Sequence, residues 1–167
     1  MKLHTLKNLP TKQEIKYFIG VDPGLTGATA VLDAENLLLL LPHSKLTAAQ
    51  YRKALLKYRK SSYVMIENVH AAPKKVQGVV SAFTFGTQFG QVKWAFPCMG
   101  YDEKMVVRVD PARWQGNLRC LTKGRKLVSK IKAWKLYPEH KKKITLDTAD
   151  GVLIAHYCRK VLNERSL

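Results

Sequence analysis

The stretch YFIGVDPGLTGATAVLDAENLLLLL, residues 17–41, contains three largely apolar runs. They occupy 17–21, 28–32 and 37–41, with Asp22-Pro23-Gly24 after the first and Asp33-Ala34-Glu35-Asn36 after the second. Short apolar runs bounded by Gly, Pro, Asp and Asn are typical of buried strands. Because tight turns separate them, the stretch predicts three consecutive strands in an antiparallel meander.

Helices and further strands are predicted after this meander. Thr47 is a suitable N-cap for a helix that runs through Arg59, and 63–66 is a buried strand that ends on Glu67. The remaining predicted elements are helices over 79–96, 127–136 and 146–162 and a fifth strand over 105–109. This order predicts an α/β fold, with one five-stranded mixed sheet flanked by helices. We expect a single domain over 17–163, preceded by a basic N-terminal arm over 1–16.

The charge balance is strongly basic. Of 167 residues, 29 are Lys or Arg and 12 are Asp or Glu, which gives a formal net charge of +17. This excess argues against an acidic cation buffer and favours a polyanionic partner, with nucleic acid preferred to a membrane surface. The longest apolar run, 37–41, is too short to span a bilayer, so no membrane partner is expected.

The cysteines and the N-terminus favour a reducing intracellular compartment, either cytoplasmic or associated with viral or organelle DNA. Cys98, Cys120 and Cys158 are an odd number of widely spaced cysteines without a CxxC pair. That pattern indicates neither a disulfide framework nor a cysteine zinc site. Residues 1–16 lack the apolar stretch of an export signal.

Four acids occupy positions that suggest chemistry. Asp22 ends the first predicted strand, Glu67 ends the fourth, and Asp147 and Asp150 are three residues apart at the start of the last predicted helix, on one face. Two strand ends and a helix start can bring such carboxylates together. Clustered carboxylates suit Mg²⁺ or Mn²⁺, and two such ions can support phosphodiester hydrolysis. Each acid also has a structural interpretation, as a turn residue or as a first-turn helix acid.

Several motifs resemble the RuvC-type Holliday junction resolvases. They span 18–161, nearly the whole chain, and the first and last are specific as a pair. They comprise FIGVDPG at 18–24, IENVHA at 66–71, VSAFTFG at 80–86 with Phe89-Gly90, VDP at 109–111 with Trp114, Lys126 and Ser129 before LYP at 136–138, and DTADGVLIA at 147–155.

This resemblance implies a ribonuclease H-like fold and a structure-selective endonuclease. Such an enzyme resolves four-way DNA junctions as a homodimer by symmetric phosphodiester hydrolysis, with Mg²⁺ or Mn²⁺ as cofactor. The implied metal-binding and catalytic carboxylates are Asp22, Glu67, Asp147 and Asp150. Lys126 matches a functionally important lysine of the family, and Lys123 is the second choice.

The remaining basic residues are predicted to contact DNA. Thirteen Lys or Arg and two acids lie between residues 104 and 143, the densest positive segment. The predicted DNA contacts are Lys74, Lys75, Lys123, Arg125 and Lys130. The helix over 79–94 is a candidate dimer interface, although core packing explains its apolar residues equally well. Two other functions stay open: a broader branched-DNA endonuclease, and a non-catalytic DNA-architectural protein.

Overall fold

The computed structural model describes residues 15–68, 78–122 and 125–164. Most of the predicted N-terminal arm, and the predicted DNA contacts Lys74, Lys75 and Lys123, lie outside these residues. No helix in the described ranges combines the length and the apolar character needed to cross a bilayer.

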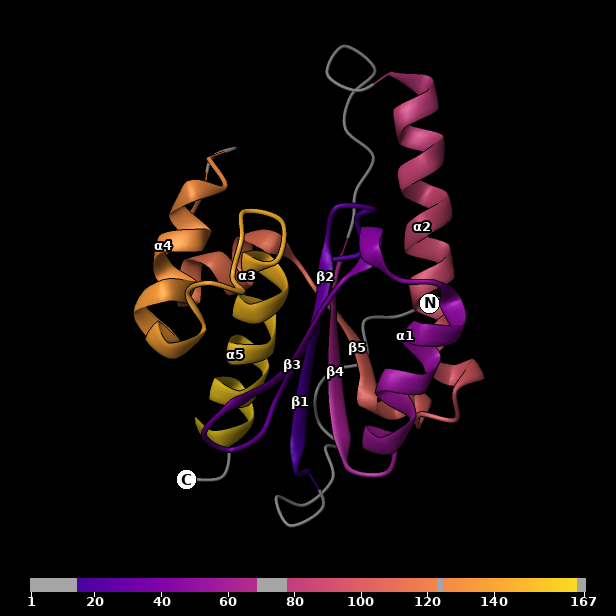
Figure 1. Ribbon diagram of the computed structural model, residues 1–167, viewed down its shortest axis with the longest axis horizontal. Coiled ribbons are helices and arrows are strands. Elements are labelled where there is room, and N and C mark those ends of the chain that lie inside the picture. Colours follow the sequence, from indigo (N-terminus) through magenta and orange to yellow (C-terminus); the bar gives the residue numbers. More distant parts are fainter. Residues whose placement is uncertain (1–14, 69–77, 123–124, 165–167) are drawn as a thin grey trace.

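A five-stranded mixed sheet forms the centre of the fold (Figure 1). Its strands are β1 (Tyr17–Val21), β2 (Ala28–Leu32), β3 (Leu37–Pro42), β4 (Ser62–Glu67) and β5 (Val106–Val109). Their spatial order is β3-β2-β1-β4-β5. The first three strands pair antiparallel, whereas β1–β4 and β4–β5 pair parallel. The predicted meander and mixed sheet are confirmed.

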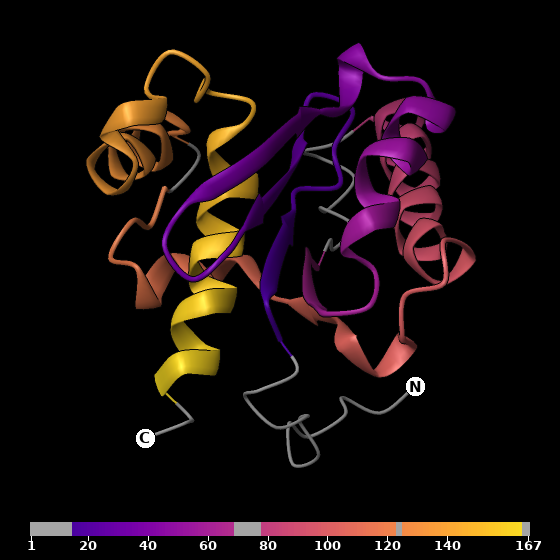
Figure 2. The ribbon, with the colours of Figure 1, turned by 60° about the horizontal axis from the view of Figure 1, so that its bottom comes forward.

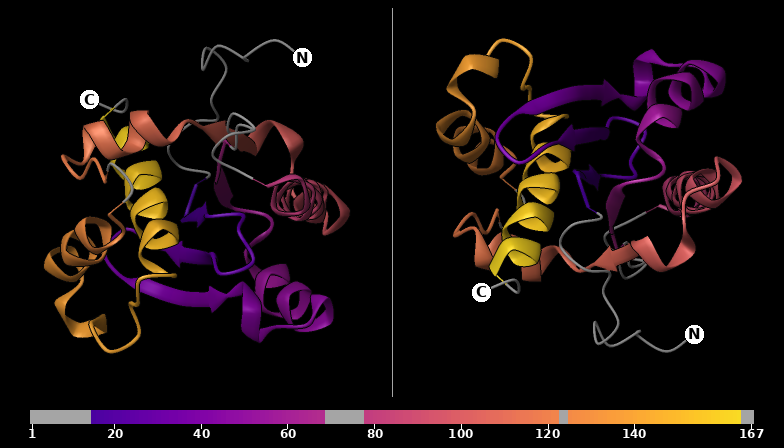
Figure 3. Two further views of the ribbon diagram at one scale, coloured as in Figure 1. Left: turned by 90° about the horizontal axis from the view of Figure 1, so that it is seen from above. Right: turned by 90° about the horizontal axis from the view of Figure 1, so that it is seen from below.

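Helices cover both faces of this sheet. They are α1 (Ala48–Leu55), α2 (Val79–Cys98), α3 (Pro111–Asn117), α4 (Leu127–Leu136) and α5 (Ala149–Glu164). Figures 2 and 3 show α3, α4 and α5 on one face and α1 and α2 on the other. The N-terminal half of α2 projects beyond the sheet edge (Figure 1).

Two apolar cores result, one on each face of the sheet. The first includes Trp114 of α3, Leu153 of α5 and Tyr137, directly after α4, over Phe18 and Met65 of the sheet. The second places Leu55 of α1 and Phe96 of α2 over the opposite side chains of the same strands, such as Ile19 and Ile66. This alternation along β1 and β4 is expected for strands buried on both faces.

The helices differ from the sequence prediction in several places. The helix predicted to run through Arg59 ends at Leu55, and residues 56–58 form a separate 3₁₀ turn. Helix α3 was not predicted, although Pro111 occupies its first turn, where a missing N–H costs nothing. The last helix begins at Ala149 rather than at 146. The Thr145 N–H donates to Thr148 Oγ1 (2.8 Å), which closes a turn before the helix. Asp147 therefore lies in this turn and not on a helix face.

Helix α5 packs unusually close to the sheet. A Cβ at Gly20 of β1 would collide with the backbone nitrogen of Ala155, and a Cβ at Gly151 would lie 2.5 Å from the carbonyl oxygen of Ala28. Any side chain at Gly20 or Gly151 would therefore push the helix away. This contact fixes the position of α5, and of Asp150 within it, relative to β1 and β2.

Candidate active site

Parallel pairing brings Asp22 and Glu67 to the same edge of the sheet. Val21 of β1 is in register with Ile66 of β4, so the next residues along, Asp22 and Glu67, emerge side by side. On the far side of β4, Glu67 is in register with Val109, and the Asn68 N–H donates to the Val109 carbonyl (2.7 Å). The carboxyl ends of parallel strands are the usual location of ligand sites in α/β folds.

A chain of hydrogen bonds fixes the loop that follows Asp22. His43 Nδ1 lies 3.0 Å from the Gly24 carbonyl, which can only accept, so Nδ1 carries the proton and Nε2 accepts. Nε2 therefore accepts from Thr29 Oγ1 (2.9 Å), which leaves this oxygen to accept from the Tyr51 hydroxyl (2.7 Å). Burial lowers the pKa of His43, in keeping with a neutral ring.

The loop folds back onto Asp22 as well. The Gly24 N–H donates to Asp22 Oδ1 (3.3 Å), and the Asp22 N–H donates to the carbonyl of Ala28 (3.0 Å). Both bonds hold the side chain at the end of β1. The first bond lies within the VDPG turn, whereas the second needs Ala28, the first residue of β2.

Asp22, Glu67 and Asp150 line one open cavity of about 450 Å³, which we call the acidic cavity. Lys126, at the start of α4, lies in the same wall. Its other lining residues come from the loop after β1 and from α2: Gly24, Leu25, Thr26, Thr84 and Gln88. Three of the four predicted acids thus meet in one place, together with the predicted lysine.

Asp147 is the predicted acid that does not line this cavity. It is exposed in the turn before α5. Its charge still raises the pKa of Asp22, so the two carboxylates lie within electrostatic range of each other. Asp147 is therefore at the margin of the site.

Burial and mutual repulsion disfavour the charged form of these carboxylates. Burial, then the charges of Asp22 and Asp150, raise the pKa of Glu67 to about 8. Burial is also the main reason that the pKa values of Asp22 and Asp150 are raised. Lys126 opposes the shift at all three sites without cancelling it. The cavity therefore contains three carboxyl groups and one cation, and ionisation of all three carboxyl groups is costly.

Three buried polar atoms at this site lack a hydrogen-bond partner among the described residues. They are Asp150 Oδ1, Ser129 Oγ and Trp114 Nε1. Ser129 is near enough to Asp150 to lower its pKa, and Trp114 has the same effect on Glu67, although neither donor makes a hydrogen bond of ordinary geometry. Ser129 is thus available as a hydrogen-bond donor to Asp150, and Trp114 as a donor to Glu67.

This donor set suits a hard divalent cation. The ligands available are carboxylate oxygens, one of them buried and without a partner in the described chain, in a cavity where carboxyl groups outnumber the single lysine. Within the described ranges, no three acid, His or Cys side chains already stand close enough together to enclose an ion. Carboxylates that repel one another separate when no cation holds them.

The predicted DNA contacts on α4 can be placed in part. Arg125 is exposed directly before Lys126. Lys130 lies one turn further along α4, and its ammonium group sits 4.5 Å above the ring of Trp134. Neither residue lines the acidic cavity. Their role in DNA binding stays a prediction.

Sequence reasoning missed the supports of the site. His43 cannot be singled out from the sequence, because its hydrogen bond to Gly24 spans nineteen residues. Ser129 and Trp114 were noted only as parts of motifs. Their shared feature, a polar side chain within an apolar segment, is the signal that points to a buried partner.

Comparison with solved structures identifies the fold. No protein-family model matches this sequence, and no curated protein sequence matches it. The structure of Thermus thermophilus RuvC in complex with a Holliday junction substrate is similar, with a TM-score of 0.64 and 17% identity over 90% of this chain and 97% of that one. Another structure of Thermus thermophilus RuvC gives a TM-score of 0.58 and 19% identity over the same shares of both chains. The ribonuclease H-like fold implied by the sequence motifs is therefore confirmed.

Proposed function

We propose that this chain is a divalent-metal-dependent DNA endonuclease that resolves Holliday junctions by symmetric cleavage. The observation that carries the proposal is the meeting of Asp22, Glu67 and Asp150 with Lys126 in one open cavity of a chain with a net charge of +17. A basic protein attracts DNA, but an acidic cavity repels phosphate unless a cation is present. A nuclease reconciles these two features.

Asp22, Glu67 and Asp150 would hold Mg²⁺ or Mn²⁺, two ions in all, with Asp147 at the margin of the set. Such ions lower the pKa of bound water and stabilise negative charge on a phosphate. The rigid loop around Gly24 holds Asp22 in place, and Ser129 and Trp114 orient Asp150 and Glu67 from behind. Lys126 adds a positive charge at the cavity wall, where it can stabilise charge that develops on the phosphodiester.

DNA would reach this site along basic segments of the chain. Arg125 directly precedes Lys126, and Lys130 lies in the first turn of α4. Lys74, Lys75 and Lys123 complete the proposed set of contacts. Such contacts position DNA and set its salt-dependent affinity, without reading its sequence. We place the reaction in a reducing intracellular compartment, in keeping with three unpaired cysteines at 98, 120 and 158.

The active form would be a homodimer that pairs through α2. Val80, Phe83 and Trp94 are 79%, 76% and 64% exposed, and at 100° per residue they fall on one stripe of this helix. A four-way junction has two opposed strands to cut, so a two-fold protein fits it. Phe83→Arg should yield a monomer by sedimentation, whereas an unchanged oligomer would exclude this face.

Cleavage of matched DNA substrates tests the proposal. With Mg²⁺, the protein should cut a four-way junction at paired sites and cut a three-way junction and a linear duplex much more slowly. Asp150→Asn should keep junction binding and lose cleavage, because it removes a charged ligand and keeps the shape. Asp102→Asn is the matched control, since Asp102 is exposed and caps the turn before β5.

The rival functions give different results. Equal rates on all three substrates would replace the resolvase by a broader branched-DNA endonuclease. Junction binding without cleavage in the wild type would favour the architectural protein. Unimpaired cleavage by Asp150→Asn would show that the active site has been assigned to the wrong residues.

A further inference from the structure

A second cavity, of about 350 Å³, lies among α3, α4 and α5. Its polar lining consists of Asn117, Arg119, Lys132, His156 and Lys160, and two leucines complete it. Three of these seven residues carry a positive charge, and none is acidic. We call it the basic cavity. It shares no lining residue with the acidic cavity, and His156 is six residues further along α5 than Asp150, about 9 Å in a helix.

The electrostatic potential in the basic cavity is positive. After burial, the causes that lower the pKa of His156 to about 4 are the charges of Arg159, Lys132 and Lys160. Glu164 moderates this field, since it lies 3.7 Å from the Lys160 ammonium, which also donates to Asn117 Oδ1 (2.9 Å). Lys132 and Arg119 make no salt bridge in the described part of the chain. The cavity is therefore complementary to an anion.

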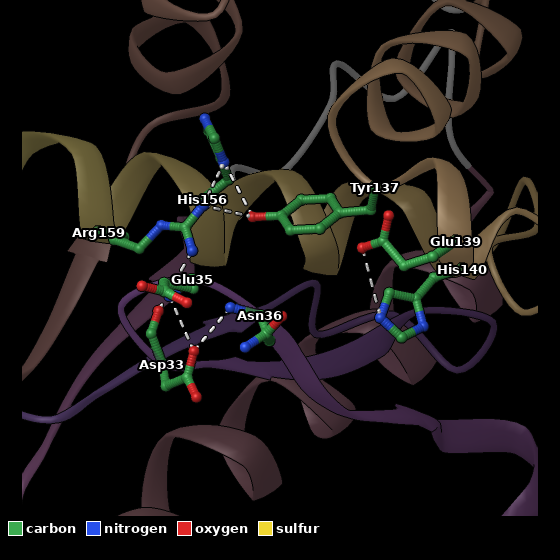
Figure 4. A network of polar contacts seen from close by, with 8 residues as sticks. All are labelled: Asp33, Glu35, Asn36, Tyr137, Glu139, His140, His156 and Arg159. Carbon is green, nitrogen blue, oxygen red and sulfur yellow. Dashed lines mark hydrogen bonds and ion pairs between the residues drawn. The ribbon is translucent and has the colours of Figure 1, made fainter.

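His156 presents a hydrogen-bond donor at this cavity. Its Nδ1 lies 3.3 Å from an Arg159 nitrogen, which can only donate, so Nδ1 accepts and Nε2 carries the proton. The Tyr137 hydroxyl is 2.9 Å from the same Nδ1. Figure 4 shows the second ring nitrogen pointing away from Tyr137 and Arg159. A neutral His156 can thus donate one N–H to an anion.

Arg159 itself is occupied by structural contacts. It donates to the carbonyls of Asp33 (3.2 Å) and Ala34 (3.1 Å) and to the Tyr137 hydroxyl (3.1 Å), as Figure 4 shows in part. These bonds attach the β2–β3 turn to α5. Arg159 therefore contributes charge to the basic cavity and is not available as a ligand.

Arg119 has a backbone conformation that favours glycine. It is the only non-glycine residue with a positive φ among the described residues, at 54°. It follows the C-cap of α3, where a left-handed residue is usually glycine, and a larger side chain there costs about 1 kcal/mol. A strained arginine at the rim of a basic cavity indicates that its guanidinium group is useful there.

We propose that the basic cavity binds one phosphate group of a nucleic acid backbone, held by Arg119, Lys132 and the His156 N–H. This site is separate from the proposed catalytic cavity, and it requires neither cleavage nor junction selectivity. Arg119 supplies a planar pair of donors and Lys132 a point charge, which is a common combination for phosphate. Helices α4 and α5 both begin beside the acidic cavity, so the phosphate bound here lies further along the DNA than the one to be cut.

Duplex binding by charge-matched variants tests the proposal. Affinity for a labelled linear duplex is measured by fluorescence anisotropy in EDTA over a series of KCl concentrations. Arg119→Gly removes the cation and relieves the backbone strain, so it should be at least as heat-stable as the wild type. Lys60→Ala is the control, since it removes one exposed charge that does not line the basic cavity. Arg119→Lys keeps the charge, and Lys132→Gln is a second disabling variant.

We expect Arg119→Gly and Lys132→Gln each to weaken duplex binding by up to about eightfold at roughly 0.1 M salt, the value for complete loss of one phosphate contact, which contributes about 0.9 to the slope of log K against log salt. That slope should fall in each variant, by up to about 0.9. Arg119→Lys should recover most of the affinity, and Lys60→Ala should change neither quantity.

Two results would overturn the proposal. In the first, Arg119→Gly and Lys132→Gln bind the duplex with the same affinity and the same salt slope as Lys60→Ala. In the second, inorganic phosphate at constant ionic strength raises the melting temperature of the wild type but not that of Arg119→Gly. At the same time, the wild type and Arg119→Gly bind the duplex equally well. The cavity would then serve a soluble phosphate. Failure of junction cleavage alone bears on the proposed function and leaves this site intact.

Discussion

Glu67→Gln should stabilise the protein in the absence of divalent ions, and the gain should grow with pH. The pKa of Glu67 is raised from 4.5 to about 8 in the folded state. Between these values the folded chain keeps a proton that the unfolded chain has released, so stability falls as pH rises through this window. Glutamine has no proton to lose and avoids this cost.

The size of the effect follows from the shift. A shift from 4.5 to about 8 corresponds to ~5 kcal/mol once Glu67 is fully ionised, at about 1.4 kcal/mol per pKa unit. This is an upper limit, because Asp22 and Asp150 contribute to the shift and can take up a proton in its place. We expect at least ~2 kcal/mol at about pH 8.5, which raises the melting temperature by roughly 4–8 °C in a chain of this size.

The assay is thermal unfolding in EDTA at about pH 5 and about pH 8.5. Glu67→Gln should melt close to the wild type at the lower pH and clearly above it at the higher one. Glu103→Gln, an exposed glutamate before β5, serves as the control and should melt like the wild type at both. Added Mg²⁺ should then stabilise the wild type more than Glu67→Gln. A gain that does not depend on pH, or a loss of stability at the higher pH, would refute the crowding of carboxylates in the acidic cavity.

Three further outcomes are expected. Gly151→Ala should lose about 3 kcal/mol or more in urea unfolding, because its Cβ would lie 2.5 Å from the Ala28 carbonyl oxygen. Ser129→Ala should change stability in EDTA by less than about 1 kcal/mol, since its hydroxyl has no hydrogen-bond partner in the described chain. With Mg²⁺ it should slow junction cleavage about tenfold, because it removes a donor that can orient the charged Asp150; unchanged cleavage would count against this positioning role. His156→Gln should lessen the loss of stability on acidification from about pH 6.5 to about pH 4, because a pKa lowered to about 4 makes the folded state resist a proton that the unfolded state accepts; equal acid sensitivity in variant and wild type would contradict this.

The sheet and the strand-end carboxylates are largely readable from sequence. Runs of apolar residues ended by Asp22 and by Glu67 are local patterns, and short turns make a meander the simple arrangement for the first three strands. The parallel pairing of β1 with β4 is not a local property, since a helix and more than thirty residues separate them. The sequence resemblance supplied that step.

The start of the last helix and the basic cavity were beyond sequence reasoning for different reasons. The sequence around Asp147 and Asp150 is compatible with a helix that begins at 146 or at 149, and a hydrogen bond between Thr145 and Thr148 decides between these boundaries. Arg119, Lys132 and Lys160 come from three segments of a generally basic sequence. Only the packing of α3, α4 and α5 distinguishes them from the other lysines and arginines.

The close packing of α5 against β1 limits how the acidic cavity and the basic cavity can influence each other. A helix that transmits a signal usually slides by 1–2 Å, about the amount that a packed interface tolerates. Here the backbone of Ala155 already rests on Gly20, and that of Gly151 on Ala28, so sliding would drive main chain into main chain. Occupancy of one cavity therefore cannot shift α5 to alter the other. Substitutions at Asp150 and at Arg119 should therefore change the free energy of unfolding additively, to within ~0.5 kcal/mol, when both are made in one chain.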